Sequence, residues 1–399
     1  MRPFVVANIV AGLALLAGCE PGPLPSPSPS TPTTAPAPEP ATPLREADGT
    51  VKVGLLLPLS GDAAPIGADL LAAAQLALQD LDGAPLALLP KDTGGTAQGA
   101  GEAAQAVLAE GAGLILGPLF SQAVEGAAPH ARARAVNVIA LSNSATVAGD
   151  GVYILGYRPD EQVARVVGYA VDQGLSRIAG LGPRDAYGDL ALDALRANIG
   201  RAGGELGPVL TYGSDTAEQA DVIREAALGG GGAPFNAMLI ADGGVQLRSV
   251  ASLLGYYDLD ASVVRYLGTM RWLSDPANLT DPYLQDAWLA APDPTRQAQF
   301  AARFVNTFGR EPHEAASLAY DATMLAAALA DDPAFPAQTP ALLLDAGGHE
   351  GAYGRFRLRA DGLNQRALAV LAIEQGQLRV IDAPPASFDE RFASATNRP

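Results

Sequence analysis

Short polar side chains follow several apolar runs of this sequence, at positions where a strand would end. Hydroxyl groups and backbone amides in such turns can bind the carboxylate or another polar group of a small ligand. The same residues can instead cap the helices that follow them, and the sequence leaves both interpretations open. The candidate ligand contacts are Ser60, Ser121, Gln122, Ser142, Asn143, Ser144, Tyr187, Asp242 and Arg271, and the turns at Asp92-Thr93 and Asp185 are of the same kind.

No set of residues typical of an enzyme accompanies these turns. The sequence has no G-x-S-x-G turn, no H-E-x-x-H motif and no lysine directly after a glycine-rich turn. Its three histidines, His130, His313 and His349, lie far apart in the chain. Residues 99–104 fit a loosened dinucleotide fingerprint, but the start of a helix explains these glycines better. We therefore expect a binding protein without catalytic activity, and we expect no cofactor and no metal.

The charge of the chain argues against nucleic acid as a partner. The 399 residues carry a net charge of −17, the only lysines are Lys52 and Lys91, and the arginines are scattered. Such a chain has no basic groove that could neutralise a phosphate backbone. Apolar residues make up 48% of the sequence, which is a globular composition, and the length allows two domains with full cores.

The first residues predict an exported lipoprotein. The apolar run from Phe4 to Ala17 is too short to span a bilayer, so we interpret residues 1–18 as a signal peptide. Its end, Leu16-Ala17-Gly18-Cys19, resembles the bacterial lipobox, which implies cleavage before Cys19 and attachment of lipid to its thiol. The alternative is a plain signal peptide with an incidental cysteine. Because Glu20 follows rather than aspartate, the resemblance favours the outer membrane over the inner membrane.

A proline-rich segment separates Cys19 from the expected domain in the periplasm. Proline occupies nearly every second position between Glu20 and Pro43, so residues 19–49 are expected to form an extended tether without a core. At about 3.1 Å per residue, the tether would reach on the order of 70 Å. Contact with the membrane would then be through the N-terminal lipid only. Cys19 is the only cysteine, which excludes an intrachain disulfide.

Strand-like and helix-like segments alternate from residue 50 onward. The first unit is the apolar run Val51–Leu57, a polar turn and a helix over Ala68–Leu81. Similar units follow to about residue 268 in two series, and this alternation predicts parallel sheets with helices on both faces. The later elements that we expect are helices at Thr295–Phe308 and Ala315–Ala330 and strands at Tyr353–Arg359, Ala367–Ile373 and Gln377–Ile381, the last two joined by a Gln375-Gly376 turn.

Four motifs together resemble the type 1 periplasmic binding proteins of the leucine/isoleucine/valine class. They are Leu56–Gly61, Gly117–Ser121, Asp185–Gly188 and Ala319–Ala322, and their order and spacing agree from about residue 50 to 382. The resemblance implies an α/β fold with two Rossmann-like lobes, each on a parallel sheet, joined by a three-segment hinge. The implied division is residues 50–157 and 289–345 for lobe 1, residues 158–288 and 346–383 for lobe 2, and residues 384–399 for a C-terminal tail.

Within that superfamily the sequence is similar to the penicillin-binding-protein activator lipoproteins of the LpoA type. The lipobox, the tether, Lys91–Thr96, Gly117–Phe120, Tyr256–Asp258 and Leu267–Thr269 carry this similarity. It implies a regulator that contacts a peptidoglycan synthase, namely a class A penicillin-binding protein. LpoA-type proteins of enteric bacteria have a helical-repeat domain before this fold, where this sequence has the tether.

The resemblance to the amino-acid binders assigns roles to several candidates. Ser121, Ser142 and Ser144 fall where those proteins bind the ligand carboxylate, and Tyr187 falls where an aromatic side chain covers the ligand. Those proteins also carry an acidic residue for the ligand ammonium, where this sequence has Thr269-Met270-Arg271. Because a buried ammonium without a counter-charge is costly, Arg271 favours an anionic ligand or none.

Two functions therefore stand as alternatives. The first is a regulator of a peptidoglycan synthase, which rests on the lipobox, the tether and the missing acidic residue. The second is the solute-binding component of an ABC permease for amino acids or a similar small polar solute. Small-molecule binding separates the two, because only the second requires it.

Overall fold

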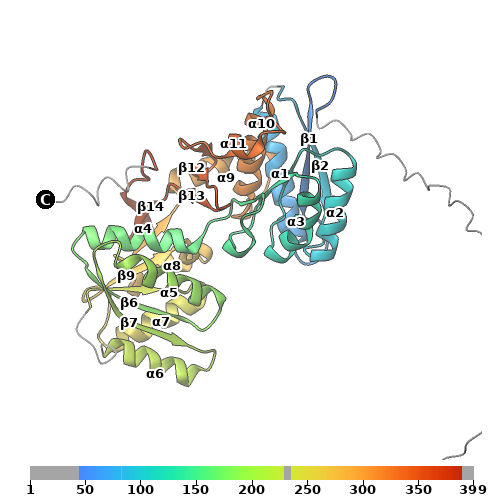
Figure 1. Ribbon diagram of the computed structural model, residues 1–399. Helices are drawn as coiled ribbons and strands as arrows, with labels where there is room; N and C mark the ends of the chain where they lie inside the picture. Colours follow the sequence, from blue (N-terminus) through green and yellow to red (C-terminus); the bar gives the residue numbers. More distant parts are fainter. Residues whose placement is uncertain (1–44, 82, 229–234, 389–399) are drawn as a thin grey trace, which may run out of the picture. The chain divides into compact units, whose positions relative to one another are not determined.

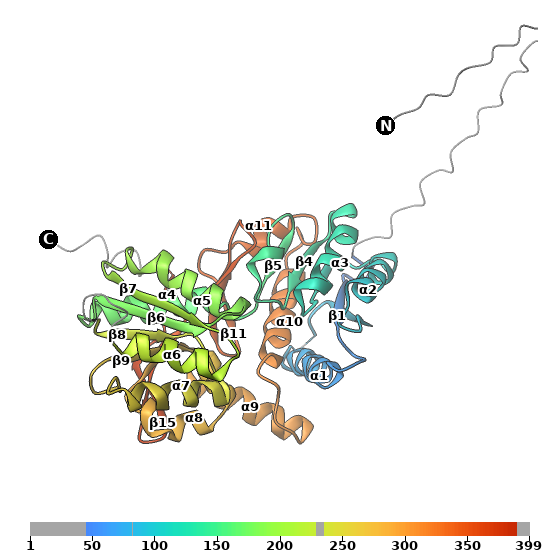
Figure 2. The same ribbon diagram turned by 90° about the horizontal axis from the view of Figure 1, so that it is seen from below.

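The computed structural model describes residues 45–81, 83–228 and 235–388, which belong to one compact unit (Figure 1). The expected signal peptide, Cys19 and most of the expected tether lie outside the described residues, as does the tail beyond residue 388. Two sheets, each with helices on both faces, confirm the predicted α/β fold with two lobes (Figure 2). No helix in the described ranges is long and apolar enough to cross a membrane.

The first sheet is wholly parallel, with the strand order β2-β1-β3-β4-β5. Its strands are β1 (Val51–Leu57), β2 (Leu86–Asp92), β3 (Leu114–Leu116), β4 (Asn137–Ala140) and β5 (Val152–Ile154). Helices α2 (Ala97–Ala109) and α3 (Ser121–Ala133) cover one face, and α1 (Ala64–Asp80), α9 (Pro294–Phe308) and α10 (Ala316–Ala330) cover the other. Leu55 and Leu57 pack into one core and Leu56 into the other, which explains the unbroken apolar run of β1.

The second sheet has the strand order β15-β14-β10-β9-β8-β6-β7. Its strands are β6 (Arg177–Pro183), β7 (Glu205–Tyr212), β8 (Ala237–Ile240), β9 (Arg265–Thr269), β10 (Trp288–Ala291), β14 (Ala369–Glu374) and β15 (Gln377–Asp382). Helices α4 (Pro159–Asp172) and α5 (Ala186–Ile199) pack on one face, and α6 (Thr216–Ala227) and α7 (Gly244–Tyr256) on the other. The short elements near its edge are η3 (Met270–Ser274), α8 (Ala277–Thr280) and η4 (Pro282–Leu284).

The second sheet is parallel from β10 to β7 and carries an antiparallel hairpin at its other edge. β14 runs antiparallel to both β10 and β15. The turn between β14 and β15 is the predicted Gln375-Gly376 pair, and both residues have a positive φ, of 52° and 77°. A two-residue turn of this kind can join only antiparallel strands, so the hairpin cannot extend a parallel sheet.

The chain passes between the two sheets three times, after β5, after β10 and before β14. β10 pairs with β9 and β14, so the second sheet extends to Ala291 rather than to the expected boundary at 288. The strands β11 (His349–Gly351), β12 (Gly354–Leu358) and β13 (Asn364–Arg366) form a small antiparallel sheet. The apolar side chains of this sheet pack into the core of the first lobe, although residues 346–383 were expected in the second. The remaining short elements are η1 (Ala145–Val147) and α11 (Thr339–Leu343).

The last residues of the expected tether are part of the folded unit. The guanidinium of Arg45 donates hydrogen bonds to the carbonyl oxygens of Gly49 at 2.7 Å, Ala330 at 2.9 Å and Asp332 at 3.1 Å. Arg45 also forms an isolated bridge with Val51. Residues 45–49 therefore belong to the folded unit, and the Arg45 side chain connects them to the end of α10.

Helices α2 and α3 lie close together because Gly126 has no side chain. A Cβ atom at Gly126 would lie 2.0 Å from the carbonyl oxygen of Ala97. We expect Gly126→Ala to lower the free energy of unfolding by about 1–3 kcal/mol, since the two helices must separate. Gly168→Ala in α4 is the matched control, because nothing lies within 4 Å of that Cβ position. Urea unfolding measures both, and equal stability of the two variants would contradict the prediction.

Candidate functional site

The first sheet places the lobe 1 candidates along one edge. Ser60 follows β1, Ser121 begins α3 after β3, and Ser142 follows β4. Because β1, β3 and β4 are neighbours and parallel, the turns at their carboxyl ends are adjacent. In open α/β sheets this edge is where ligands bind.

The lobe 1 candidates differ in what their side chains already contact. The amide of Gln122 donates to the carbonyl oxygen of Gly95 at 2.8 Å, so Gln122 ties two loops together. Ser142 is buried, and its hydroxyl accepts the N–H of Ser144 at 3.2 Å, while the Ser144 hydroxyl lies 2.8 Å from that of Thr146. Asn143 between them is exposed.

Ser121 is the lobe 1 candidate best placed to bind a ligand. It is the first residue of α3, and no side chain caps this helix. Its hydroxyl and the first N–H groups of α3 therefore lie together at a helix N-terminus, which favours negative charge. The alternative reading of Ser121 as a cap does not hold, because the capping position is Phe120.

A cavity of about 320 Å³ lies beside Ser60 in the first lobe. Its lining residues are Ser60, Asp92, Thr93, Gly94, Thr96, Gln98, Gly99 and Glu102. The Asp92 carboxylate accepts the N–H groups of Leu59 and Gly94, both at 2.8 Å. These bonds, together with the Ser60 hydroxyl, which contributes most, hold the pKa of Asp92 below its usual value.

The Asp92 turn gives a pH-dependent contribution to stability. Because the folded-state pKa is lowered, the contribution is present above the unfolded pKa and is lost as pH falls through the folded pKa. We expect Asp92→Asn to cost less than about 1 kcal/mol at pH 7, since the carboxylate is exposed, and a smaller amount at pH 2. Asp62→Asn, at a neighbouring exposed turn, is the control. Urea midpoints at the two pH values test this, and an equal loss at both would refute it.

The lobe 2 candidates Tyr187 and Arg271 form one contact group with Thr269. The Tyr187 hydroxyl lies 2.5 Å from the Thr269 hydroxyl, and the Arg271 guanidinium lies 4.2 Å from the centre of the Tyr187 ring. Burial raises the pKa of Tyr187, so its hydroxyl stays protonated at neutral pH. Arg271 itself is exposed. The group thus presents a guanidinium held over an aromatic ring at the carboxyl end of β9.

Asp242 lies beside this group, at the carboxyl end of the neighbouring strand β8. Its side chain is buried, with 5% of the residue exposed. The carboxylate accepts the Tyr212 hydroxyl and, at 2.7 Å, the N–H of Gly243. Burial and the adjacent Asp242 raise the pKa of Tyr212, which keeps the phenol a hydrogen-bond donor. Tyr212 was not among the candidates predicted from the sequence, although it is the last residue of β7 and therefore lies at a strand end like the others.

The candidates form two separate sets, one for each lobe. Within the described residues, the structure records no hydrogen bond or ion pair between the lobe 1 and lobe 2 candidates. The same part of the chain holds no group of three or more histidine, cysteine or acidic side chains placed to bind a metal ion. What the sets offer chemically is recognition of a polar solute by hydroxyls, backbone amides, one guanidinium and one buried carboxylate.

The family model described as "Periplasmic binding protein" matches residues 50–377. The chain belongs to the periplasmic binding protein family. This confirms the broad part of the resemblance, and closeness to the LpoA type stays a prediction. No curated protein sequence matches this periplasmic binding protein.

Several solved structures of similar fold are of ABC transporter proteins. A candidate branched-chain amino acid ABC transporter protein from Rhodospirillum rubrum is 18% identical, with a TM-score of 0.74, over 83% of this chain and 100% of the other. A branched-chain amino acid ligand-binding protein from Burkholderia xenovorans LB400 is 19% identical, with a TM-score of 0.70, over 85% and 97%. A solute-binding protein from Rhodopseudomonas palustris BisB5, solved with 3,4-dihydroxybenzoic acid, is 19% identical, with a TM-score of 0.62, over 86% and 99%. At such identities these likenesses show the fold alone.

Proposed function

We propose that this periplasmic binding protein is the solute-binding component of an ABC importer, and that its solute is a small organic molecule with a carboxylate. The observation that carries the proposal is Arg271, whose exposed guanidinium lies over the Tyr187 ring at the carboxyl end of β9. A guanidinium held in this way can bind a carboxylate through two parallel hydrogen bonds.

Two further features support a solute that carries negative charge. In the first lobe, the uncapped N-terminus of α3 at Ser121 favours an anion. In the second, Thr269 and Arg271 occupy the place where amino-acid binders of this class carry an acidic residue. The relatives with solved structures are ABC transporter proteins, which adds support from their shared fold.

Thermal unfolding of residues 42–399 against amino acids, hydroxy acids and aromatic acids tests the proposal. A ligand at a hundred times its dissociation constant adds about 2.7 kcal/mol, which raises the midpoint by roughly 4 °C for a unit of this size. Arg271→Ala should reduce the shift to about half or less without changing the midpoint of the free protein. No shift with any carboxylate would overturn the importer function.

A second candidate function is the regulation of a peptidoglycan synthase. An exposed aromatic pair favours a protein contact, because Tyr256 is 77% exposed and its ring lies 5.1 Å from that of Tyr257. These tyrosines belong to the segment that resembles the LpoA type. The test is association of the folded unit with the class A penicillin-binding proteins of its host. Tyr256→Ser should weaken the association, and Val245→Ser at the other end of α7 is the exposed control.

The proposed location follows from the N-terminal sequence. We propose that Cys19 carries lipid and that the tether holds the domain in the periplasm, anchored to the outer membrane. Mass spectrometry of the mature N-terminus tests the anchor, because Cys19→Ser should remove the acyl mass. Fractionation of the two membranes tests the location.

A further inference from the structure

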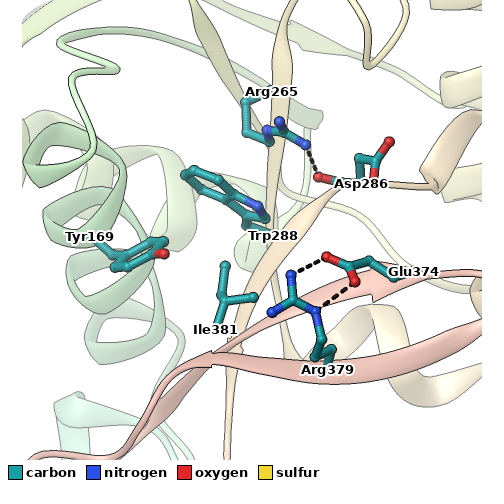
Figure 3. Close-up of a pocket in the computed structure, with 7 residues that line it drawn as sticks. All are labelled: Tyr169, Arg265, Asp286, Trp288, Glu374, Arg379 and Ile381. Carbon is teal, nitrogen blue, oxygen red and sulfur yellow. Dashed lines mark hydrogen bonds and ion pairs between the residues drawn. The ribbon is translucent and has the colours of Figure 1, made fainter.

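A second cavity lies away from the candidate site, at the opposite end of the second sheet. It has a volume of about 340 Å³ and is lined by Tyr169, Arg265, Asp286, Trp288, Glu374, Arg379 and Ile381 (Figure 3). Arg265 and Trp288 are the first residues of the parallel strands β9 and β10, whereas Thr269 is the last residue of β9. The cavity is therefore separate from the strand-end turns that carry the proposed importer function.

Two aromatic side chains, Tyr169 and Trp288, line one part of this cavity, and most of the other lining residues are charged. The rings of Tyr169 and Trp288 meet edge to face, with their centres 5.1 Å apart. Trp288 pairs with Ala372, which in turn pairs with Arg379, so Trp288 and Arg379 share one face of the sheet. Ile381 lies at a register shift of β15 and packs against the same hydrophobic cluster as Trp288. Two aromatic side chains beside an aliphatic one give an apolar surface against which a planar ring can pack.

Unused hydrogen-bond donors border these walls. The Arg265 guanidinium lies 4.8 Å from the centre of the Trp288 ring and donates to the backbone oxygen of Asp286. No carboxylate among the described residues forms an ion pair with Arg265. Arg379 donates two N–H groups to Glu374, and its remaining terminal nitrogen is directed toward Ile381 in Figure 3.

The carboxylates of the lining do not cancel these donors. Glu374 is already engaged through both oxygens by Arg379. The Asp286 carboxylate points away from Trp288 in Figure 3, and only its backbone oxygen meets Arg265. The Tyr169 hydroxyl has no hydrogen bond within the described ranges and points toward the interior of the cavity. The cavity thus places two aromatic side chains beside the Arg265 guanidinium, whose charge helps to lower the pKa of Glu374 but which forms no direct ion pair within the described residues.

We propose that this cavity binds a small aromatic carboxylate, with its ring against Trp288 and its carboxylate on Arg265. The volume lies within the usual range for small-molecule sites of about 300–1,000 Å³. An aliphatic acid would have no ring to pack against Trp288. A neutral aromatic compound would have no carboxylate to accept hydrogen bonds from Arg265. This inference is independent of the importer function, because it uses none of the same side chains.

The two tryptophans of the chain allow the two sites to be observed separately. Trp288 lines the cavity, whereas Trp272 is buried beside Arg271, with its indole N–H bonded to the Ile240 oxygen at 3.1 Å. Benzoate is titrated into ¹⁵N-labelled residues 42–399, and the two indole signals are followed by NMR. The Trp288→Phe variant lacks the indole signal of Trp288, so comparison with the unchanged protein assigns both signals. We expect a saturable shift of the Trp288 signal, and at least tenfold weaker binding of both cyclohexanecarboxylate and benzyl alcohol.

Three variants complete the test. Arg265→Gln should weaken benzoate binding at the Trp288 signal at least tenfold. Arg271→Gln, and Arg196→Gln on the exposed surface of α5, should leave it unchanged. A Trp288 signal that does not move at millimolar benzoate, or one that moves equally in Arg265→Gln, overturns the inference. A shift of the Trp272 signal alone would also overturn it and would instead support binding at the strand-end site.

Discussion

Replacing Asp321 by asparagine should lower the free energy of unfolding by about 3–5 kcal/mol. Asp321 in α10 is fully buried, and its carboxylate receives the Arg366 guanidinium at 3.2 Å and the N–H of Ala352 at 2.6 Å. Arg366 is 4% exposed and donates to the carbonyl oxygen of Leu155 at 2.8 and 3.2 Å. Burial raises the pKa of Asp321, and the Arg366 charge opposes this rise. Without the carboxylate, Arg366 would be a buried cation with no counter-charge.

Urea unfolding of residues 42–399 measures this loss. Asp331→Asn, at the exposed end of the same helix, is the matched control and should change stability by less than about 0.5 kcal/mol. Combining Asp321→Leu with Arg366→Met removes both charges and should restore much of the stability lost in Asp321→Asn. If the double variant is less stable than the single one, the buried charge is not the source of the loss.

The same buried pair joins two of the three segments that pass between the sheets. Leu155 belongs to the first passage, and Arg366 ends β13 just before the third. Arg158 donates to the Asn364 oxygen and Asn364 donates to the Gly156 oxygen, both at 2.9 Å, which adds a second set of bonds between these segments. Because all these groups are buried or half-buried, the passages are held together without relying on exposed ion pairs.

The regular elements could be predicted from the sequence because their signals are local. The run Val51–Leu57 is β1 to the residue, and the Gln375-Gly376 turn marks the hairpin of β14 and β15. The small sheet was only partly foreseen, because β11 and β13 are short and polar. Asn364 and Arg366 of β13 are buried by partners distant in the chain, and no periodicity in the sequence shows such partners.

The candidate site, like the small sheet, could be predicted from the sequence only in part. Placing serines and Tyr187 at strand ends needs only the order of strands and turns. Whether a side chain is free depends on how the loops meet, as for Gln122, which is bonded to the Gly95 oxygen. The aromatic cavity could not be foreseen, since Arg265, Trp288 and Arg379 come together through the register of separate strands.

Arg271→Ala should reduce the affinity for the proposed carboxylate ligand by roughly 10- to 100-fold, the cost of losing a charged hydrogen-bond partner. The guanidinium is placed by its contact with the Tyr187 ring, so Tyr187→Leu should give a smaller loss in the same direction. Arg196→Ala, an exposed arginine paired with Asp193, is the control. Isothermal titration with a carboxylate that stabilises the protein measures all three. An unchanged affinity in Arg271→Ala would remove Arg271 from the site.

The variant Asp242→Asn tests whether a carboxylate-bearing solute of this site also carries an ammonium group. The amide oxygen introduced by this substitution can still accept the Tyr212 hydroxyl, so the variant removes a buried negative charge while keeping that bond. If the solute is an α-amino acid, Asp242 is the counter-charge nearest the Arg271 group, and its loss should weaken binding roughly tenfold or more. If the solute carries no ammonium, the lost repulsion should leave binding unchanged or tighter. We expect the second result, because the exposed Arg271 guanidinium beside Tyr187 would repel an ammonium.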